Sequence, residues 1–87
     1  MRAFLIHKLV IAADVPEEAG EFYRQEIGGE LPKTIAELSP DTEVRCDDGQ
    51  KKTIRARIGE ELDQRNAWLR MGVPCELHWP FVVGDLA

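Results

Sequence analysis

The chain has 87 residues, of which 44% are hydrophobic and 31% are charged, and its formal net charge is −5. This length accommodates one domain, residues 1–87, and the composition is typical of a folded globular protein rather than a disordered one. Because it has no apolar run of the ~18 residues that a membrane span needs, only two cysteines and no signal-peptide pattern, we expect a cytoplasmic protein without a disulfide framework.

The first third of the chain predicts a strand followed by a helix. Residues 4–11 are rich in β-branched and large apolar side chains and predict a central strand. A helix start follows, where Asp14 can accept from a free backbone N–H and Pro16 is tolerated in the first turn. Apolar residues then recur at helical spacing as far as Ile27, and Gly28-Gly29 supplies the left-handed residue that ends the helix. One face of this helix should pack, while the other is acidic.

Two short polar segments follow, Thr34–Leu38 and Glu43–Asp47, and both alternate as strands do. Residues 47–50 have the sequence Asp-Asp-Gly-Gln, which is typical of a tight turn. We therefore expect a hairpin or a meander in the middle of the chain.

Two periodicities compete after Thr53. Residues 54–58 alternate as in a strand, but the apolar side chains also recur at helical spacing as far as Leu69. We prefer a helix that Thr53 caps and that Gly72 closes. An interior Gly59 costs a helix roughly 1 kcal/mol relative to Ala, so a later start and a strand over 54–58 both stay open.

The last predicted element is a strand over Cys75–Val83, which Pro80 should confine in part to a sheet edge or a bulge. The predicted order is therefore β-α-β-β-α-β. It indicates an α+β fold, a two-layer sandwich in which a small, mainly antiparallel sheet carries both helices on one face. This order is ferredoxin-like, although the weak middle strands leave the strand order open.

Charge segregation is the clearest functional signal. Residues 12–48 carry eleven carboxylates against three basic side chains, a net of −8, whereas residues 49–70 carry six bases against three carboxylates. Such asymmetry is evidence about association rather than about fold. A solvated acidic surface with no partner is the alternative that stays open. The side chains that we expect to bind a partner are Glu17, Glu18, Glu21, Asp41, Glu43, Asp47 and Asp48.

Catalytic and metal sites have little support in the sequence. His7, Cys46, Cys75 and His78 have zinc-ligating side chains, but residues 75 and 78 would point to opposite faces of a strand and no paired knuckles are present. No motif provides a thiolate-stabilising environment or an oxyanion site for a cysteine nucleophile. We therefore expect a protein that is not an enzyme and that binds no metal or cofactor.

The basic segment 51–70 provides an alternative function. Nucleic-acid binding would use these bases, with Trp68 as a stacking ring, although the overall negative charge opposes it. The chain would then be an accessory or regulatory factor. Trp68 and Trp79 are expected to be core or rim aromatic residues, but either one would be a good anchor for a protein partner if it is exposed. The bases in this segment are Lys51, Lys52, Arg55, Arg57, Arg65 and Arg70.

The run from Val10 to Gly28 resembles the opening of many small phage and prophage accessory proteins, with a strand, an "AA…PEEA" helix start and an aromatic stripe. Residues 35–40 look like their "ELS" segment, and Gly72-Val-Pro74 precedes a last apolar strand as it does in them. The resemblance implies a small, acidic, non-enzymatic protein of a mobile element that acts in the cytoplasm of a bacterial host. It supplies no set of functional residues.

Inhibitors of host defence, such as anti-CRISPR proteins, are the class that this resemblance favours. An acidic face can occupy a basic groove that normally holds nucleic acid, and charge steering accelerates the encounter. The expected partner is therefore a host protein complex with a basic groove, for example a CRISPR surveillance complex. Neither a membrane nor direct nucleic-acid binding is expected.

Overall fold

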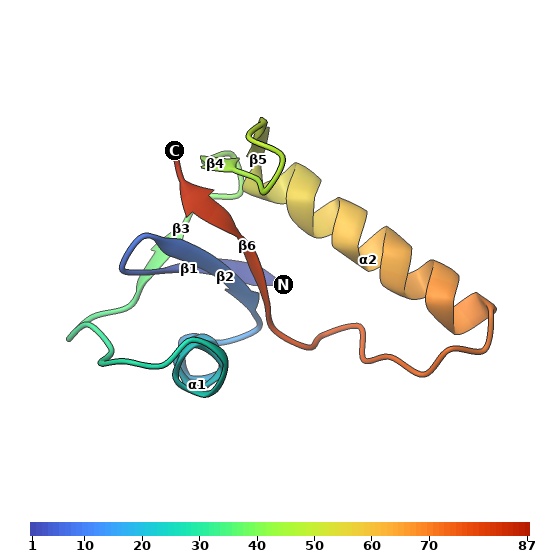
Figure 1. Cartoon of the computed structure of the whole chain (residues 1–87), viewed down its shortest axis with the longest axis horizontal. Helices are drawn as coiled ribbons and strands as arrows, with labels where there is room; N and C mark the ends of the chain where they lie inside the picture. Colours follow the sequence, from blue (N-terminus) through green and yellow to red (C-terminus); the bar gives the residue numbers. More distant parts are fainter.

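The computed structural model describes residues 1–87 and has an α+β fold (Figure 1). Six strands form one curled, fully antiparallel sheet with the order β3-β1-β2-β6-β4-β5. The elements in chain order are β1 (Arg2–Ile6), β2 (Leu9–Ala13), α1 (Pro16–Glu26), β3 (Ala36–Leu38), β4 (Glu43–Arg45), β5 (Lys51–Thr53), α2 (Ile54–Arg70) and β6 (Phe81–Leu86). Neither helix combines the length and the apolar character needed to cross a membrane.

The two helices cover opposite faces of the sheet, so the prediction of a two-layer sandwich with both helices on one face is wrong. On one face, Phe4 of β1 packs in a cluster with Ala19 and Tyr23 of α1. On the other face, Ala3 belongs to a cluster that includes Ile54 of α2. Figure 1 shows α1 and α2 on different sides of the β1–β2 hairpin. Because both faces of these strands are apolar, each face must be buried against a different element.

The first apolar run forms a hairpin, not the single strand predicted over residues 4–11. β1 and β2 pair from Arg2 with Ala13 to Ile6 with Leu9, which leaves a two-residue turn. His7, the first turn residue, has a φ of 56°. Two-residue hairpin turns use such positive φ values and usually place Gly or Asn there, so no residue type marked this turn in the sequence. The observed order is therefore β-β-α-β-β-β-α-β rather than the ferredoxin-like one.

Helix α1 lies where the sequence predicts it, but its N-cap is different. The N-cap residue is Val15, which makes no side-chain cap. Asp14, the predicted cap, lies with its Oδ1 3.3 Å from Nδ1 of His78. The predicted glycine stop is confirmed: Gly28 has a φ of 87°, and its N–H donates to the carbonyl of Tyr23 at 2.9 Å.

The two predicted middle strands form, but they do not pair with each other. β3 lies at one edge of the sheet beside β1, whereas β4 lies between β6 and β5. The predicted tight turn at residues 47–50 joins β4 to β5. In this turn Gly49 has a φ of 81°, and Oδ1 of Asp48 accepts from the N–H of Gln50 at 3.0 Å. A hairpin is therefore present, but it pairs β4 with β5, a strand that the sequence analysis did not predict.

Helix α2 begins at Ile54, which confirms the preferred helix over the competing strand pattern. Oγ1 of Thr53 accepts from the N–H of Ala56 at 3.2 Å, as expected of an N-cap. The N–H groups of the first two helical residues donate to the carbonyl groups of Thr42 and Pro40, at 2.9 Å each. Three of the four donors that a helix start leaves free are thus satisfied.

Replacing Thr53 with Ala should remove one of these hydrogen bonds and lower the free energy of unfolding by about 1 kcal/mol. Thr53→Ser, which keeps the hydroxyl, is the matched control and should stay close to the unsubstituted protein. Urea unfolding followed by circular dichroism measures both. Equal midpoints for the two variants would contradict the role of the Thr53 hydroxyl as the cap.

The last strand lies inside the sheet, between β2 and β4, so the prediction of a strand over residues 75–83 at an edge or a bulge is only partly right. β6 begins at Phe81, one residue after Pro80, and runs to Leu86. Residues 75–80 form an irregular segment instead. Their carbonyl groups bond to an arginine of α2 rather than to a neighbouring strand.

Candidate functional site

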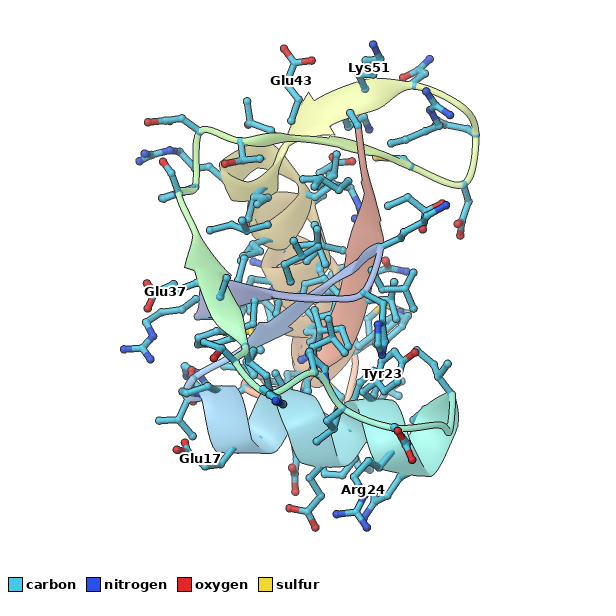
Figure 2. The ribbon with its side chains drawn as sticks, turned by 90° about the vertical axis from the view of Figure 1, so that its left-hand side faces the viewer. Glu17, Tyr23, Arg24, Glu37, Glu43 and Lys51 are labelled. Carbon is cyan, nitrogen blue, oxygen red and sulfur yellow. The ribbon has the colours of Figure 1, made fainter.

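The predicted acidic residues fall into two groups rather than on one face. Glu17, Glu18 and Glu21 lie on α1, whereas residues 41–48 lie around β4 and its flanking turns. Figure 2 shows Glu17 and Glu43 at opposite ends of the molecule. The two groups therefore cannot act as one continuous acidic surface, and each must be judged by its own neighbours.

The α1 group is exposed and has no internal ion pair. No basic group lies within ion-pair distance of Glu17, Glu18 or Glu21. Glu21 accepts one side-chain hydrogen bond, from Nε2 of Gln25 to its Oε1 at 3.4 Å. Glu17 and Glu18 also lie in the first helical turn, where a carboxylate favours the helix dipole by about 0.3–1 kcal/mol. Stabilisation of the helix is therefore a sufficient reason for carboxylates at positions 17 and 18. It does not explain the carboxylate of Glu21, which lies beyond the first turn.

The second group is partly neutralised. Oδ1 of Asp41 pairs with Nη2 of Arg55 at 3.1 Å. Asp47 and Asp48 line the same hollow as Lys52 and Arg57, so positive charge lies among the carboxylates. Of the predicted side chains in this group, Glu43 and Asp47 have neither an ion pair nor a side-chain hydrogen bond. Ion pairing within the chain is therefore present at this end, whereas the α1 carboxylates have none.

Lys52 illustrates this neutralisation. Its Nζ lies 3.1 Å and 3.0 Å from the two carboxylate oxygens of Glu60, and this hydrogen bonding raises the pKa of Lys52 above its ordinary value of 10.5. Partial desolvation opposes the shift, and the negative charge of Asp48 adds to it. Lys52 therefore stays protonated at neutral pH and joins β5 to α2.

A groove of about 590 Å³ lies next to the α1 group. One wall is α1 and the other is the irregular segment before β6. This groove was not predicted, because the sequence pattern indicated a regular strand in the second wall. Two of the predicted partner-binding residues, Glu18 and Glu21, line it. Trp79, which was considered as an anchor only if exposed, is 51% exposed. The lining residues are Glu18, Glu21, Phe22 and Gln25 from α1 and Glu76, Leu77, His78, Trp79 and Pro80 from the second wall.

Arg65 holds the second wall in place. Its Nη1 donates to the carbonyl groups of Glu76, Leu77 and Trp79 at 3.0, 2.9 and 2.8 Å. Its guanidinium also lies 5.0 Å from the ring centre of Phe81. The residue is only 6% exposed. Arg65 is thus a structural anchor, not one of the surface bases among which the sequence analysis placed it.

The basic segment 51–70 is largely engaged within the chain. Arg65 is buried, Arg55 and Lys52 form ion pairs, and Nε of Arg57 donates to the carbonyl of Val83 at 3.3 Å. Lys51 lies in β5 rather than on the helix. The bases of this segment therefore do not form one continuous basic surface along α2, which weakens the basis for nucleic-acid binding.

The four candidate zinc ligands lie in different surroundings. Nε2 of His7 is 2.8 Å from the carbonyl of Glu30, and His78 contacts Asp14. Sγ of Cys75 contacts the carbonyl of Arg65 at 3.3 Å, while Cys46 lies at the end of β4. No group of three or more His, Cys, Asp or Glu side chains is arranged to hold a metal ion.

The exposed carboxylates and aromatic rings that line the groove beside α1 are suited to non-covalent binding of a cation.

Comparison with known proteins produced no match: no family model fits the sequence, and no curated protein or solved structure is similar to it. The resemblance to small phage proteins is not tested by these comparisons and stays a hypothesis. The features of this chain that bear on function are therefore its exposed carboxylates, the groove beside α1 and the Arg65 contacts that support it.

Proposed function

We propose that this chain is a small protein-binding inhibitor that uses the acidic face of α1 to occupy a basic surface of its partner. The partner class that we infer is a protein complex with a basic, nucleic-acid-binding groove, as in anti-CRISPR-type inhibition of a host defence complex. The chain would act by occlusion and carry out no catalysis.

One observation carries this proposal: three exposed carboxylates on α1 lack internal ion pairs, and two of them, Glu18 and Glu21, line a groove that also contains exposed aromatic surface. Charged residues at an interface mainly steer the encounter and select the partner, whereas aromatic side chains such as Trp79 provide most of the binding free energy. The two features lie together on this side of the molecule, and the opposite end, with its internal ion pairs, has no comparable combination.

Reversing two of these charges should weaken partner binding strongly without unfolding the chain. We expect Glu18→Lys combined with Glu21→Lys to weaken capture of a purified CRISPR surveillance complex by at least about tenfold, since like charges would then face each other. Binding of the complex to the immobilised chain, measured at low and at high salt, gives the size of the effect. Binding by the unsubstituted chain should itself decrease as salt increases.

The matched control reverses two exposed carboxylates at the other end, Glu43→Lys with Asp47→Lys, and changes the net charge by the same amount. This control should bind like the unsubstituted chain, and thermal unfolding checks that both variants fold. If the two double variants bind equally well, or if only the control loses binding, α1 is not the interface. If the complex is not retained at all, this partner class is wrong, and retention of nucleic acid alone would favour the accessory-factor alternative.

A further inference from the structure

The groove between α1 and residues 76–80 is large enough to admit a protruding side chain of a partner. Its volume of about 590 Å³ lies within the roughly 300–1,000 Å³ that is common for ligand sites. The lining combines apolar surface from Phe22, Leu77 and Pro80 with a few polar groups. Such a mixture buries part of a ligand and fixes its orientation.

The polar groups of the groove select for a cation. Glu18 and Glu21 approach from α1 and Glu76 from the opposite wall, and none of the three has a basic group within ion-pair distance. His78, at the same wall, already contacts Asp14 at 3.3 Å. A positively charged group entering here would therefore meet carboxylates from two sides without displacing an internal partner.

The aromatic surface of the groove distinguishes between cations. Trp79 is half exposed although it is a large aromatic residue, and Phe22, which is half-buried, belongs to the same lining. A planar guanidinium can stack on an indole ring and at the same time donate two parallel hydrogen bonds to a carboxylate. An ammonium group is a more strongly hydrated point charge that lacks this planar fork. The lining thus favours arginine over lysine.

The groove is also pre-organised. The backbone of its second wall is fixed because Arg65 binds the carbonyl groups of Glu76, Leu77 and Trp79, whereas the Trp79 side chain stays exposed. A ligand would not have to order this wall, which removes part of the entropic cost of binding.

We propose that the groove binds the guanidinium of an arginine side chain presented by the partner protein, stacked on Trp79 and paired with the carboxylates of Glu18, Glu21 and Glu76. This inference rests on the proposed function, since it assumes a basic protein partner. It adds to that function the place on this chain where the partner is bound, the groove, and the type of partner residue that binds there, arginine.

Nuclear magnetic resonance titration of the full chain with N-acetyl-arginine amide tests the groove without the partner. We expect saturable backbone shifts confined to residues 18–25 and 76–80, and at least several-fold weaker binding to Trp79→Ala. N-acetyl-citrulline amide, an uncharged analogue of nearly the same shape, should produce no saturable shifts. Trp68→Ala is the matched control, because Trp68 is also an exposed indole but does not line this groove, and it should bind the arginine probe normally.

Three results would overturn the groove assignment: equal responses to the arginine and citrulline probes, shifts centred on residues 43–48, or unchanged affinity of Trp79→Ala. The partner assay separates this failure from that of the proposed function. If Glu18→Lys with Glu21→Lys loses the partner while Trp79→Ala keeps it fully, the acidic-face proposal stands and the arginine groove is wrong. If neither variant changes partner binding, both proposals fail.

Discussion

Replacing Arg65 with Met should lower the free energy of unfolding by about 3 kcal/mol. The side chain is buried, and its Nη1 donates to three carbonyl groups of the segment before β6. Met retains much of the apolar stem but leaves these carbonyl groups without their donor. It also leaves Glu61, whose Oε1 lies 3.4 Å from Nε of Arg65, without a cation.

In a domain of this size, 3 kcal/mol corresponds to a decrease in Tm of roughly 12–24 °C. Differential scanning calorimetry measures it, and limited proteolysis shows whether residues 71–80 become accessible. Arg70→Met is the matched control, because Arg70 lies on the same helix but is exposed and has no ion pair, so its effect should stay below about 1 kcal/mol. Equal Tm values and equal proteolysis for the two variants would show that Arg65 does not anchor this segment.

Arg65 also shows where sequence reasoning stops. Its spacing along the helix is compatible with a base on the protein surface. Periodicity indicates on which face of a helix a residue lies, but it does not indicate which other segment of the chain packs against that face. The covering segment comes from ten or more residues further along the chain and is irregular, so neither helical nor strand periodicity marks it. The second wall of the candidate groove could not be predicted for the same reason.

Local signals in the sequence were reliable where one residue type determines the conformation of the backbone or caps a helix. The glycine stop after α1, the Asp-Asp-Gly turn before β5 and the cap at Thr53 were all predicted and are all present. The first hairpin was missed because His7 takes the positive φ that Gly or Asn usually provides. That error merged two strands into one, and the predicted layer arrangement was consequently wrong as well.

The acidic segment shows a related limit. Net charge along the chain correctly identified α1 as an exposed acidic helix, but charge counting has no information about distance in space. Residues 17 and 43 lie at opposite ends of the molecule, and Asp41 is paired with a base that the sequence analysis assigned to another surface. Of the predicted site, only Glu18 and Glu21 therefore line the groove.

Replacing Gly84 with Ala should lower the free energy of unfolding by about 2–3 kcal/mol. Gly84 lies in β6, where it pairs with Val10 of β2. A Cβ at this position would approach the carbonyl oxygen of Arg45 to 2.6 Å and its carbonyl carbon to 3.3 Å. Both are backbone atoms of β4, so no side-chain rotation relieves the contact. Strand β6 must move away from β4, which weakens the pairing that holds the β4–β5 hairpin to the sheet.

Gly59→Ala is the matched control, because the same methyl group is added where nothing lies within 4 Å. Gly59 is inside α2, so this substitution should raise the free energy of unfolding by about 0.5–1 kcal/mol through helix propensity. Urea unfolding should therefore show a lower free energy of unfolding for Gly84→Ala and a higher one for Gly59→Ala than for the unsubstituted chain. If Gly84→Ala is as stable as the unsubstituted chain, β4 does not lie against β6 as closely as the structure places it. In that case the hairpin that carries Glu43 and Asp47 would have to be positioned differently.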